Sequence, residues 1–334
     1  MQHHISLPAE WETQDAVLLA WPHAATDWRD MLDEARACYV EIAKAILKYE
    51  PLVIVSPDGL PARDIEQLSP ASHRMLNCLI STNDTWARDF GPITIFRGGI
   101  PTPLDFRFNA WGLKYAADKD NLVNLRLDGQ RLFKQPLASR QGFVLEGGSI
   151  ESDGRGTVMT TSRCLLAPNR NDHMSKEDIE EYLKLSLGAK KILWLNHGEV
   201  EGDDTDGHID TLARFAPGRT IVYNGGDEKM LEELKAFTNA EGEPFNLMEL
   251  PLPDAIVDAV GKKLPATYAN FLVINGAVLV PVYGQPEHDQ EALKVMADAF
   301  PGRAIMGIDC RPLIRQHGSL HCVTMQFPKN SLNL

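Results

Sequence analysis

Cys322, near the C-terminal end of the chain, has a side chain and neighbours suited to nucleophilic chemistry. It lies in the segment HGSLHC, directly after His321 and close to His317. A thiol with a pKa of about 8.5 is only slightly ionised at neutral pH, so a nucleophilic cysteine needs a base or a positive field. The alternative is a structural cysteine in the core, the usual state of an isolated cysteine. Cys322 is therefore a candidate nucleophile.

The segment 202–210, GDDTDGHID, combines acidic side chains with a histidine. It can be interpreted as a metal loop, as a solvated acidic loop, or as a general acid/base with its partners. The spacing lacks the later oxygen ligands and closing Glu of a calcium hand, and no HExxH supports zinc. We therefore interpret His208 as a general acid/base, with Asp210 two residues later on the same face of a strand. Asp204 and Asp206 are the remaining alternating acids.

Three further segments carry polar or aromatic side chains next to glycine. TNDTWARDFGP (82–92) contains Trp86 and Asp89, although an Arg88–Asp89 salt bridge on a loop is a simpler explanation for its charges. FVLEGG places Glu146 at the end of an apolar run, where a carboxylate is costly unless it is paired. FNAWG supplies Trp111.

The helices that must position these residues are marked by periodicity and capping. Ser175, followed three residues later by Asp178, predicts a capped helix over 175–187. Residues 226–238 and 289–300 are shorter helical candidates. A longer helix is predicted over 27–49, where apolar residues recur every three or four positions as one stripe: Met31, Ala35, Tyr39, Ile42, Ala43 and Ile46.

Short apolar runs separated by turn residues predict four β-hairpins. The fifth such segment, 321–328, starts in the same way and then stops. The four hairpins span 91–106, 147–161, 209–224 and 271–283.

One polar residue stands just before or at the start of each of these five segments, and the steps between them are 57, 62, 62 and 52 residues. Near-equal steps predict repeated units of strands plus a helix, and five units closed into a ring would bring the polar residues to one axis. The alternative is chance, because a polar residue often precedes a hairpin. The five residues are Asp89, Glu146, His208, Asn270 and Cys322.

Length and composition limit the number of domains and argue against several classes of protein. The 334 residues allow one large domain or two, and 46 acidic against 33 basic residues give a formal net charge of −13. This acidic surplus argues against nucleic-acid binding. No apolar run reaches the ~20 residues of a membrane span, and no signal peptide or nucleotide-binding motif is evident. Five scattered cysteines fit neither a complete disulfide set nor a zinc motif, so a cytoplasmic protein with reduced thiols is expected.

Taken together and in order, several segments resemble the agmatine deiminases, which belong to the bacterial-type peptidyl-arginine deiminases of the guanidine-modifying superfamily. Two positions depart from the common pattern: RQHGSLHC replaces GGGNIHC, and DGHID replaces NGHVD. The resemblance runs from PAEWE (8–12) to the last strand through these segments: WARDFGP, FNAWG, LEGGSIESDG, LLAPNRN, DTDGHIDTLARF, LPATYANFLVINGAVLVPVYG and HGSLHC.

The resemblance implies one domain over 1–334, folded as a five-bladed α/β propeller of ββαβ units, the pentein fold. It also implies roles for individual residues, whose side chains suit a planar cation that two carboxylates can bind in paired hydrogen bonds. Cys322 is the nucleophile, His208 the general acid/base, Asp89 and Asp210 the guanidinium ligands, and Glu146 the carboxylate that orients His208. Trp86, Trp111, Asp204 and Asn270 complete the expected substrate contacts.

The implied reaction is hydrolysis of agmatine to N-carbamoylputrescine and ammonia through a covalent thiouronium on the cysteine, in polyamine synthesis, without a metal or organic cofactor. A deiminase of free or peptidyl arginine is the close alternative, and a catalytically silent binding propeller is a more distant one. Free arginine would need a cationic group for its carboxylate, from Arg88, Arg170, Arg311 or Arg315. The amine of agmatine would instead prefer acidic or aromatic contacts, from Asp204, Asp206, Trp86 or Trp111. The family also suggests a homo-oligomer such as a dimer.

Overall fold

The computed structural model describes residues 4–334, and its strands form five separate sheets. The sheet orders are β1-β5-β6-β7, β10-β9-β8, β11-β12-β13, β14-β15-β16 and β17-β2-β3-β4. In chain order the strands are β1 (Ile5–Ser6), β2 (Gln14–Ala20), β3 (Leu52–Ser56), β4 (Met75–Leu79), β5 (Ile93–Arg97), β6 (Ile100–Arg107), β7 (Ala138–Val144), β8 (Ile150–Ser152), β9 (Thr157–Thr161), β10 (Lys191–Leu195), β11 (Ala213–Ala216), β12 (Thr220–Asn224), β13 (Asn246–Leu250), β14 (Leu272–Ile274), β15 (Ala277–Val282), β16 (Ala304–Asp309) and β17 (Thr324–Pro328).

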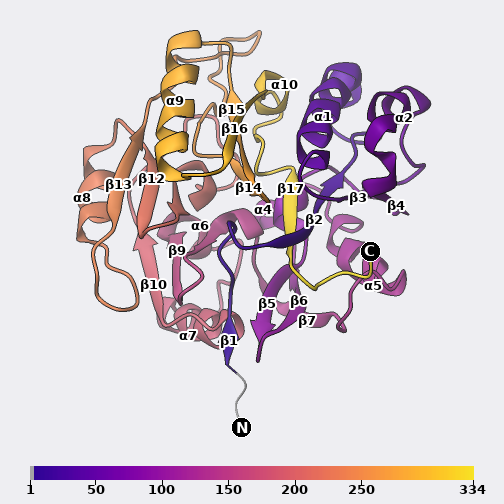
Figure 1. The fold of residues 1–334 in the computed structure, drawn as a ribbon. Coiled ribbons are helices and arrows are strands. Elements are labelled where there is room, and N and C mark those ends of the chain that lie inside the picture. The colour runs from indigo at the N-terminus through magenta and orange to yellow at the C-terminus, as the bar shows by residue number, and fades with distance from the viewer. Residues whose placement is uncertain (1–3) are drawn as a thin grey trace.

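The longer helices α1, α7, α8 and α9 lie toward the periphery, with β17 and β2 near the middle of the view (Figure 1). The α-helices are α1 (Leu32–Leu47), α2 (Ala62–Leu68), α3 (Ala87–Phe90), α4 (Ala110–Leu113), α5 (Val123–Gly129), α6 (Ser162–Leu165), α7 (Lys176–Leu187), α8 (Glu228–Ala236), α9 (Pro286–Ala299) and α10 (Arg311–Ile314). Short 3-10 helices are η1 (Arg29–Met31), η2 (Ser69–Arg74), η3 (Asp120–Leu122), η4 (Gly147–Ser149) and η5 (Ile209–Thr211).

Each sheet contains the same three-strand unit. Two strands pair antiparallel, the chain then passes through helix, and the third strand pairs parallel to the second. The four predicted hairpins are confirmed as β5–β6, β8–β9, β11–β12 and β14–β15. The predicted repetition of strand–strand–helix–strand units is therefore present in the sheets.

The fifth unit is assembled from both ends of the chain. β17, which follows Cys322, pairs antiparallel with β2, and β2 pairs parallel with β3 after α1. The segment 321–328 stops after one strand because its hairpin partner is the apolar run at 14–20. Both ends of the chain therefore contribute to the same sheet.

The predicted helices are present, with adjusted bounds. The stripe on α1 is buried as expected, and it belongs to the largest apolar cluster of the molecule together with β2, β3, β14 and β15. Ser175 caps α7 in a capping box with Asp178, in which both side-chain hydrogen bonds are formed. The helices predicted at 226–238 and 289–300 are α8 and α9.

The prediction that Asp210 lies in a strand is wrong. Residues 209–211 form the short helix η5, and β11 begins only at Ala213. Thr211 donates from its backbone N–H (3.3 Å) and its hydroxyl (2.8 Å) to the carbonyl of His208, which closes a turn. Such local hydrogen bonds compete with strand pairing. Asp210 is therefore placed by a turn and not by strand alternation.

Two further expectations concern the thiols and the membrane. All five cysteines are free and buried. Over residues 4–334, no helix combines the length and the apolar composition that crossing a bilayer requires.

Candidate active site

The five polar residues singled out by their regular spacing lie ahead of the first strand of each three-strand unit. Asp89 is in α3 before β5, Glu146 precedes η4 and β8, and His208 precedes η5 and β11. Asn270 precedes β14 and Cys322 precedes β17. All five are buried, and the contacts below show that they converge.

Cys322 is held by the side chain of Asn270. The Oδ1 atom of Asn270 lies 3.4 Å from the Cys322 thiol and accepts the backbone N–H groups of Cys322 (3.3 Å) and His321 (2.9 Å). Burial, together with the charges of Asp210 and Asp89, raises the pKa of the Cys322 thiol well above its ordinary value. The thiol is therefore neutral in the free protein, and a nearby cation would favour its ionisation.

Asp89 presents a carboxylate that is fixed on both oxygens. Its Oδ2 accepts the indole N–H of Trp111 at 2.9 Å, and its Oδ1 accepts the backbone N–H of Gly148 at 3.0 Å. Burial and the neighbouring Glu146 raise the pKa of Asp89 to about 7. The expected substrate contact Trp111 therefore also holds Asp89 in place.

His208 is completely buried, and its ring nitrogens have no hydrogen-bond partner within residues 4–334. Its Nδ1 lies 3.6 Å from Oδ1 of Asp89, and its backbone N–H donates to the hydroxyl of Thr205 at 3.0 Å. Burial and the positive charge of Arg170 hold the pKa of His208 well below its ordinary value. The ring is therefore neutral and can accept a proton.

Asp210 has one fixed oxygen and one free oxygen. Its Oδ2 lies 2.8 Å from Nδ1 of His321, whereas its Oδ1 is buried without a partner in the described part of the chain. Burial and the charge of Asp89 raise the pKa of Asp210 well above its ordinary value. A buried acceptor without a partner is costly, so the free oxygen is poised to bind a donor.

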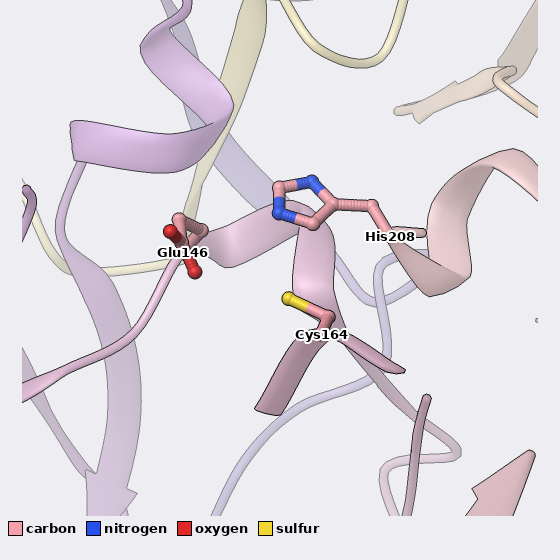
Figure 2. Close-up of side chains that lie close together, drawn as sticks. All are labelled: Glu146, Cys164 and His208. Carbon is pink, nitrogen blue, oxygen red and sulfur yellow. The ribbon is translucent and has the colours of Figure 1, made fainter. Parts of the chain in front are cut away.

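Glu146 connects the site to a buried arginine. Its Oε1 accepts from Nε of Arg170 at 2.9 Å, while its Oε2 is unpartnered among the described residues. Arg170 also binds Asp206 and the carbonyl of Thr205. Glu146 is thereby fixed, and Figure 2 shows it beside the ring of His208, with a carboxylate oxygen and a ring nitrogen within 4.8 Å of each other.

A pocket with about 480 Å³ of empty space opens above Cys322. Trp86, Trp111 and Asp89 line it together with Cys322. His208, Asp210, Glu146 and Asn270 are not part of the lining. Acidic side chains line the same pocket: Asp27, Asp84 and Asp204.

The pocket and its buried carboxylates can be compared with known proteins. The model of the Porphyromonas-type peptidyl-arginine deiminase family matches residues 6–328. The chain belongs to this deiminase family. A putative agmatine deiminase of Lactococcus lactis subsp. lactis is 36% identical, over 97% of this chain and 95% of the relative.

Solved structures agree with this family. The structure described as a putative arginine deiminase from Porphyromonas gingivalis has 49% sequence identity and a TM-score of 0.92, covering 98% of this chain and 100% of its own. C. jejuni agmatine deiminase with substrate bound has 39% identity and a TM-score of 0.90, covering 98% of this chain and 97% of its own. The α/β fold is therefore that of known deiminases.

Among residues 4–334 of this deiminase-family member, two groups of side chains have the proximity that metal ligation requires. Figure 2 shows the first, in which the ligand atoms of Glu146, Cys164 and His208 lie within 4.8 Å of one another; Glu10, Glu151 and His321 form the second. A guanidinium already neutralises each group: Arg170 binds Glu146, and Arg214 binds Glu10 and Glu151. Both are therefore explained as ion-paired networks.

The acidic segment that suggested a metal loop is also paired with cations. Lys114 binds the side chain of Asp206 at 2.9 Å and the backbone carbonyl of Asp204 at 2.6 Å. The hydroxyl of Tyr115 donates to Oδ2 of Asp204 at 2.5 Å. Asp204 also lines the pocket, and its contact to the substrate tail stays a prediction.

Several residues of this deiminase site were not found from the sequence. Gly148 is one of them. It belongs to the site because a Cβ there would lie 2.6 Å from Nδ1 of His208 and 2.9 Å from Oδ1 of Asp89. The sequence indicates it only by the pair of glycines that directly follows Glu146, because adjacent glycines leave room for side chains from other segments. Asp84 and Asp27 were also missed, although Asp84 stands two residues before Trp86 and accepts its indole N–H at 3.0 Å.

Proposed function

We propose that the protein is an agmatine deiminase, which hydrolyses agmatine to N-carbamoylputrescine and ammonia. The observation that carries the proposal is the pocket that combines the Cys322 thiol with Asp89 and three further acidic side chains. A planar guanidinium suits paired carboxylates, and acidic groups farther out suit a primary amine. The names of the relatives from L. lactis and C. jejuni support the same substrate.

The surroundings of the arginines favour agmatine over free arginine. Among residues 4–334, no arginine lines this pocket. Arg88 and Arg170 are buried, and Arg170 is bound to Glu146 and Asp206. Arg311 and Arg315 are exposed and bound to acidic partners. An α-carboxylate in the pocket would therefore face Asp27, Asp84 and Asp204 without an arginine to bind it.

In the first proposed half-reaction, Asp89 and Asp210 bind the guanidinium and hold its carbon against the sulfur. His208 takes the thiol proton, and the thiolate of Cys322 attacks the carbon to form a tetrahedral adduct. The carbon–nitrogen bond then breaks as His208 returns its proton to the departing nitrogen. Ammonia leaves, and a thiouronium remains on the sulfur.

In the second half-reaction, a water molecule attacks the thiouronium carbon while His208 takes one of its protons. The carbon–sulfur bond breaks, and the thiolate regains a proton from His208. The second proton released by the former water is carried away by ammonia as ammonium. Glu146, fixed by Arg170, orients the histidine throughout. These steps need only side chains and water.

The deciding experiment measures ammonia release from agmatine, free arginine and a blocked arginine peptide. We expect turnover of agmatine, and loss of it in Cys322→Ala because no covalent adduct can form. Cys78→Ala, at a buried thiol in β4, is the matched control and should retain activity. A preference for arginine would refute the agmatine assignment, and normal turnover by Cys322→Ala would refute the covalent mechanism.

The domain organisation, cellular location, pathway and oligomeric state are also proposed. We infer that the chain is one domain, in which the five sheets are blades of a propeller; the convergence of one residue from each sheet supports this. A nucleophilic thiol must stay reduced, which supports a cytoplasmic location. A role in putrescine synthesis follows from the proposed product, and a homodimer is inferred from the family resemblance.

A further inference from the structure

A second layer of side chains lies behind Asp210 and takes no part in the steps above. His321 connects to Asp210 through its Nδ1 atom, 2.8 Å from Oδ2. Both side chains are buried, with 1% and 0% exposed respectively. The imidazole thus contacts one carboxylate oxygen and leaves the other, Oδ1, without a partner in the described chain.

The opposite edge of the His321 ring is fixed by the N-terminal part of the chain. Its Nε2 lies 2.7 Å from Oε2 of Glu10, and the other oxygen of Glu10 accepts the backbone N–H of Val273 at 2.7 Å. Arg214 donates to the same Oε2 at 2.7 Å. Glu10 is therefore anchored by a strand amide and a guanidinium, and it holds the ring in one orientation.

Arg214 itself is anchored by further acceptors. It donates to Glu151 and to the backbone carbonyl of Phe271, at 2.6 Å for the latter. Its guanidinium carbon also lies 4.5 Å from the centre of the Phe271 ring. The support behind His321 is thus a network of several hydrogen bonds and not a single contact.

A bound cation determines the protonation of Asp210, and thereby which atom between Asp210 and His321 carries the hydrogen. When a guanidinium keeps Asp210 ionised, the carboxylate is only an acceptor, so Nδ1 of His321 must carry the hydrogen between them. Nε2, on the other side of the ring, lies 2.7 Å from Oε2 of Glu10 and 3.0 Å from a guanidinium nitrogen of Arg214. Burial and the charges of Arg214 and Arg88 hold the pKa of His321 well below its ordinary value, so the neutral ring carries a single hydrogen. With that hydrogen on Nδ1, Asp210 cannot rotate without losing a charge-assisted hydrogen bond.

We propose that His321 and Glu10 are positioning residues: His321 holds Oδ2 of Asp210 so that Oδ1 faces the guanidinium, and Glu10 locks the orientation of the His321 ring. This inference rests on the proposed function, because it concerns the carboxylate that binds the substrate. Neither residue lines the pocket above Cys322.

Two variants of equal polarity separate this role from simple packing. The amide nitrogen of His321→Asn can replace Nδ1 as the donor to Asp210, whereas that of His321→Gln replaces Nε2 and reaches Glu10 instead. Both variants remove the ring. We expect kcat/KM for agmatine to stay within about 10-fold of wild type in His321→Asn and to fall about 100-fold in His321→Gln, since small misplacements of substrate ligands cost this much.

His173→Gln, at an exposed histidine, is the control and should match wild type. Glu10→Gln should lower kcat/KM, and in combination with His321→Gln it should add little further loss, because the two residues act on Asp210 in series. Equal losses in His321→Asn and His321→Gln, or fully additive losses in the double variant, would overturn the inference.

Crystal structures of the two His321 variants provide a readout that does not depend on turnover. Asp210 should keep its orientation in His321→Asn and rotate in His321→Gln. If wild-type protein released no ammonia from agmatine, the proposed function would fail, yet these structures would still decide the inference. An unchanged Asp210 in both variants refutes it, and a rotation confined to His321→Gln supports it.

Discussion

At the scale of single residues, burial keeps the reactive groups of the free site in their neutral forms. The pKa of the Cys322 thiol is raised by burial and by nearby carboxylates, and burial also raises the pKa of Asp210. His208 is neutral because burial and Arg170 lower its pKa. A cation entering the pocket favours the charged forms of the thiol and carboxylates, so ionisation is coupled to substrate binding.

Asp89 provides a pH test of this view. Its pKa is raised from 3.8 to about 7, mainly by burial, so between these values the folded protein holds a proton that the unfolded chain releases. The contribution of Asp89 to the free energy of unfolding must therefore fall as pH rises from about 4 to 7. Asp89→Asn removes this contribution, and its melting temperature relative to wild type should rise across this range.

Asp172→Asn is the control for that measurement, because the Asp172 side chain is 74% exposed. Its melting temperature should follow that of wild type at every pH. A constant difference between Asp89→Asn and wild type would contradict the raised pKa.

Gly148 gives a second test at this scale. Its missing side chain leaves room for Nδ1 of His208 and Oδ1 of Asp89, so Gly148→Ala must displace at least one of them. We expect kcat/KM for agmatine to fall about 100-fold or more. Gly142→Ala is the matched control, because nothing lies within 4 Å of its added Cβ, and activity should be retained. Full activity in Gly148→Ala would show that the site can relax around a methyl group.

At the scale of elements, local patterns predicted the four longest helices of the described chain, α1, α7, α8 and α9, and four hairpins. The apolar stripe of α1 and the Asn275–Gly276 turn between β14 and β15 both follow from neighbouring residues alone. The turn at η5 was missed because its hydrogen bonds come from Thr211, whose hydroxyl can support a strand or a turn equally well. Local sequence therefore predicts an element best where one periodicity dominates.

The capping box of α7 tests the contribution of such a local feature. Ser175→Ala removes the acceptor for the backbone N–H of Asp178, 3.1 Å away. We expect the free energy of unfolding to fall by about 1 kcal/mol while kcat stays unchanged, because no residue of α7 lines the pocket. Urea denaturation measures the loss. Glu181→Ala, on an exposed position of the same helix, should leave stability nearly unchanged, and an equal loss there would contradict a capping role.

At the scale of the whole molecule, the site depends on contacts between distant segments. The regular spacing predicted that Asp89, Glu146, His208, Asn270 and Cys322 would meet, because repeated units place equivalent residues alike. The same reasoning could not find Glu10 or Asp27, since neither belongs to the repeat. Their positions follow from how the N-terminal segment packs, which no local pattern encodes.

Phe327 in β17 tests how strongly the sheet made by both ends supports the molecule. It is fully buried, and its ring centre lies 6.1 Å from that of Phe133. Phe327→Ala should lower the free energy of unfolding by about 3–5 kcal/mol, through lost burial and a new cavity. Phe327→Leu, which keeps most of the volume, should cost clearly less. Equal denaturation midpoints for wild type and Phe327→Ala would show that β17 contributes little.

The pairing of β17 with β2 also determines when the protein can become active during its synthesis. Cys322 leaves the ribosome after every other residue of the proposed site, and β2 must wait for its antiparallel partner until residues 324–328 have emerged. Domains commonly fold as units while the chain grows. Here a nascent chain can form the middle sheets early, yet it lacks both the sulfur and the strand that aligns it. On the proposed mechanism, a nascent chain without Cys322 cannot form the covalent adduct, so activity begins only after β17 has been made and has paired with β2.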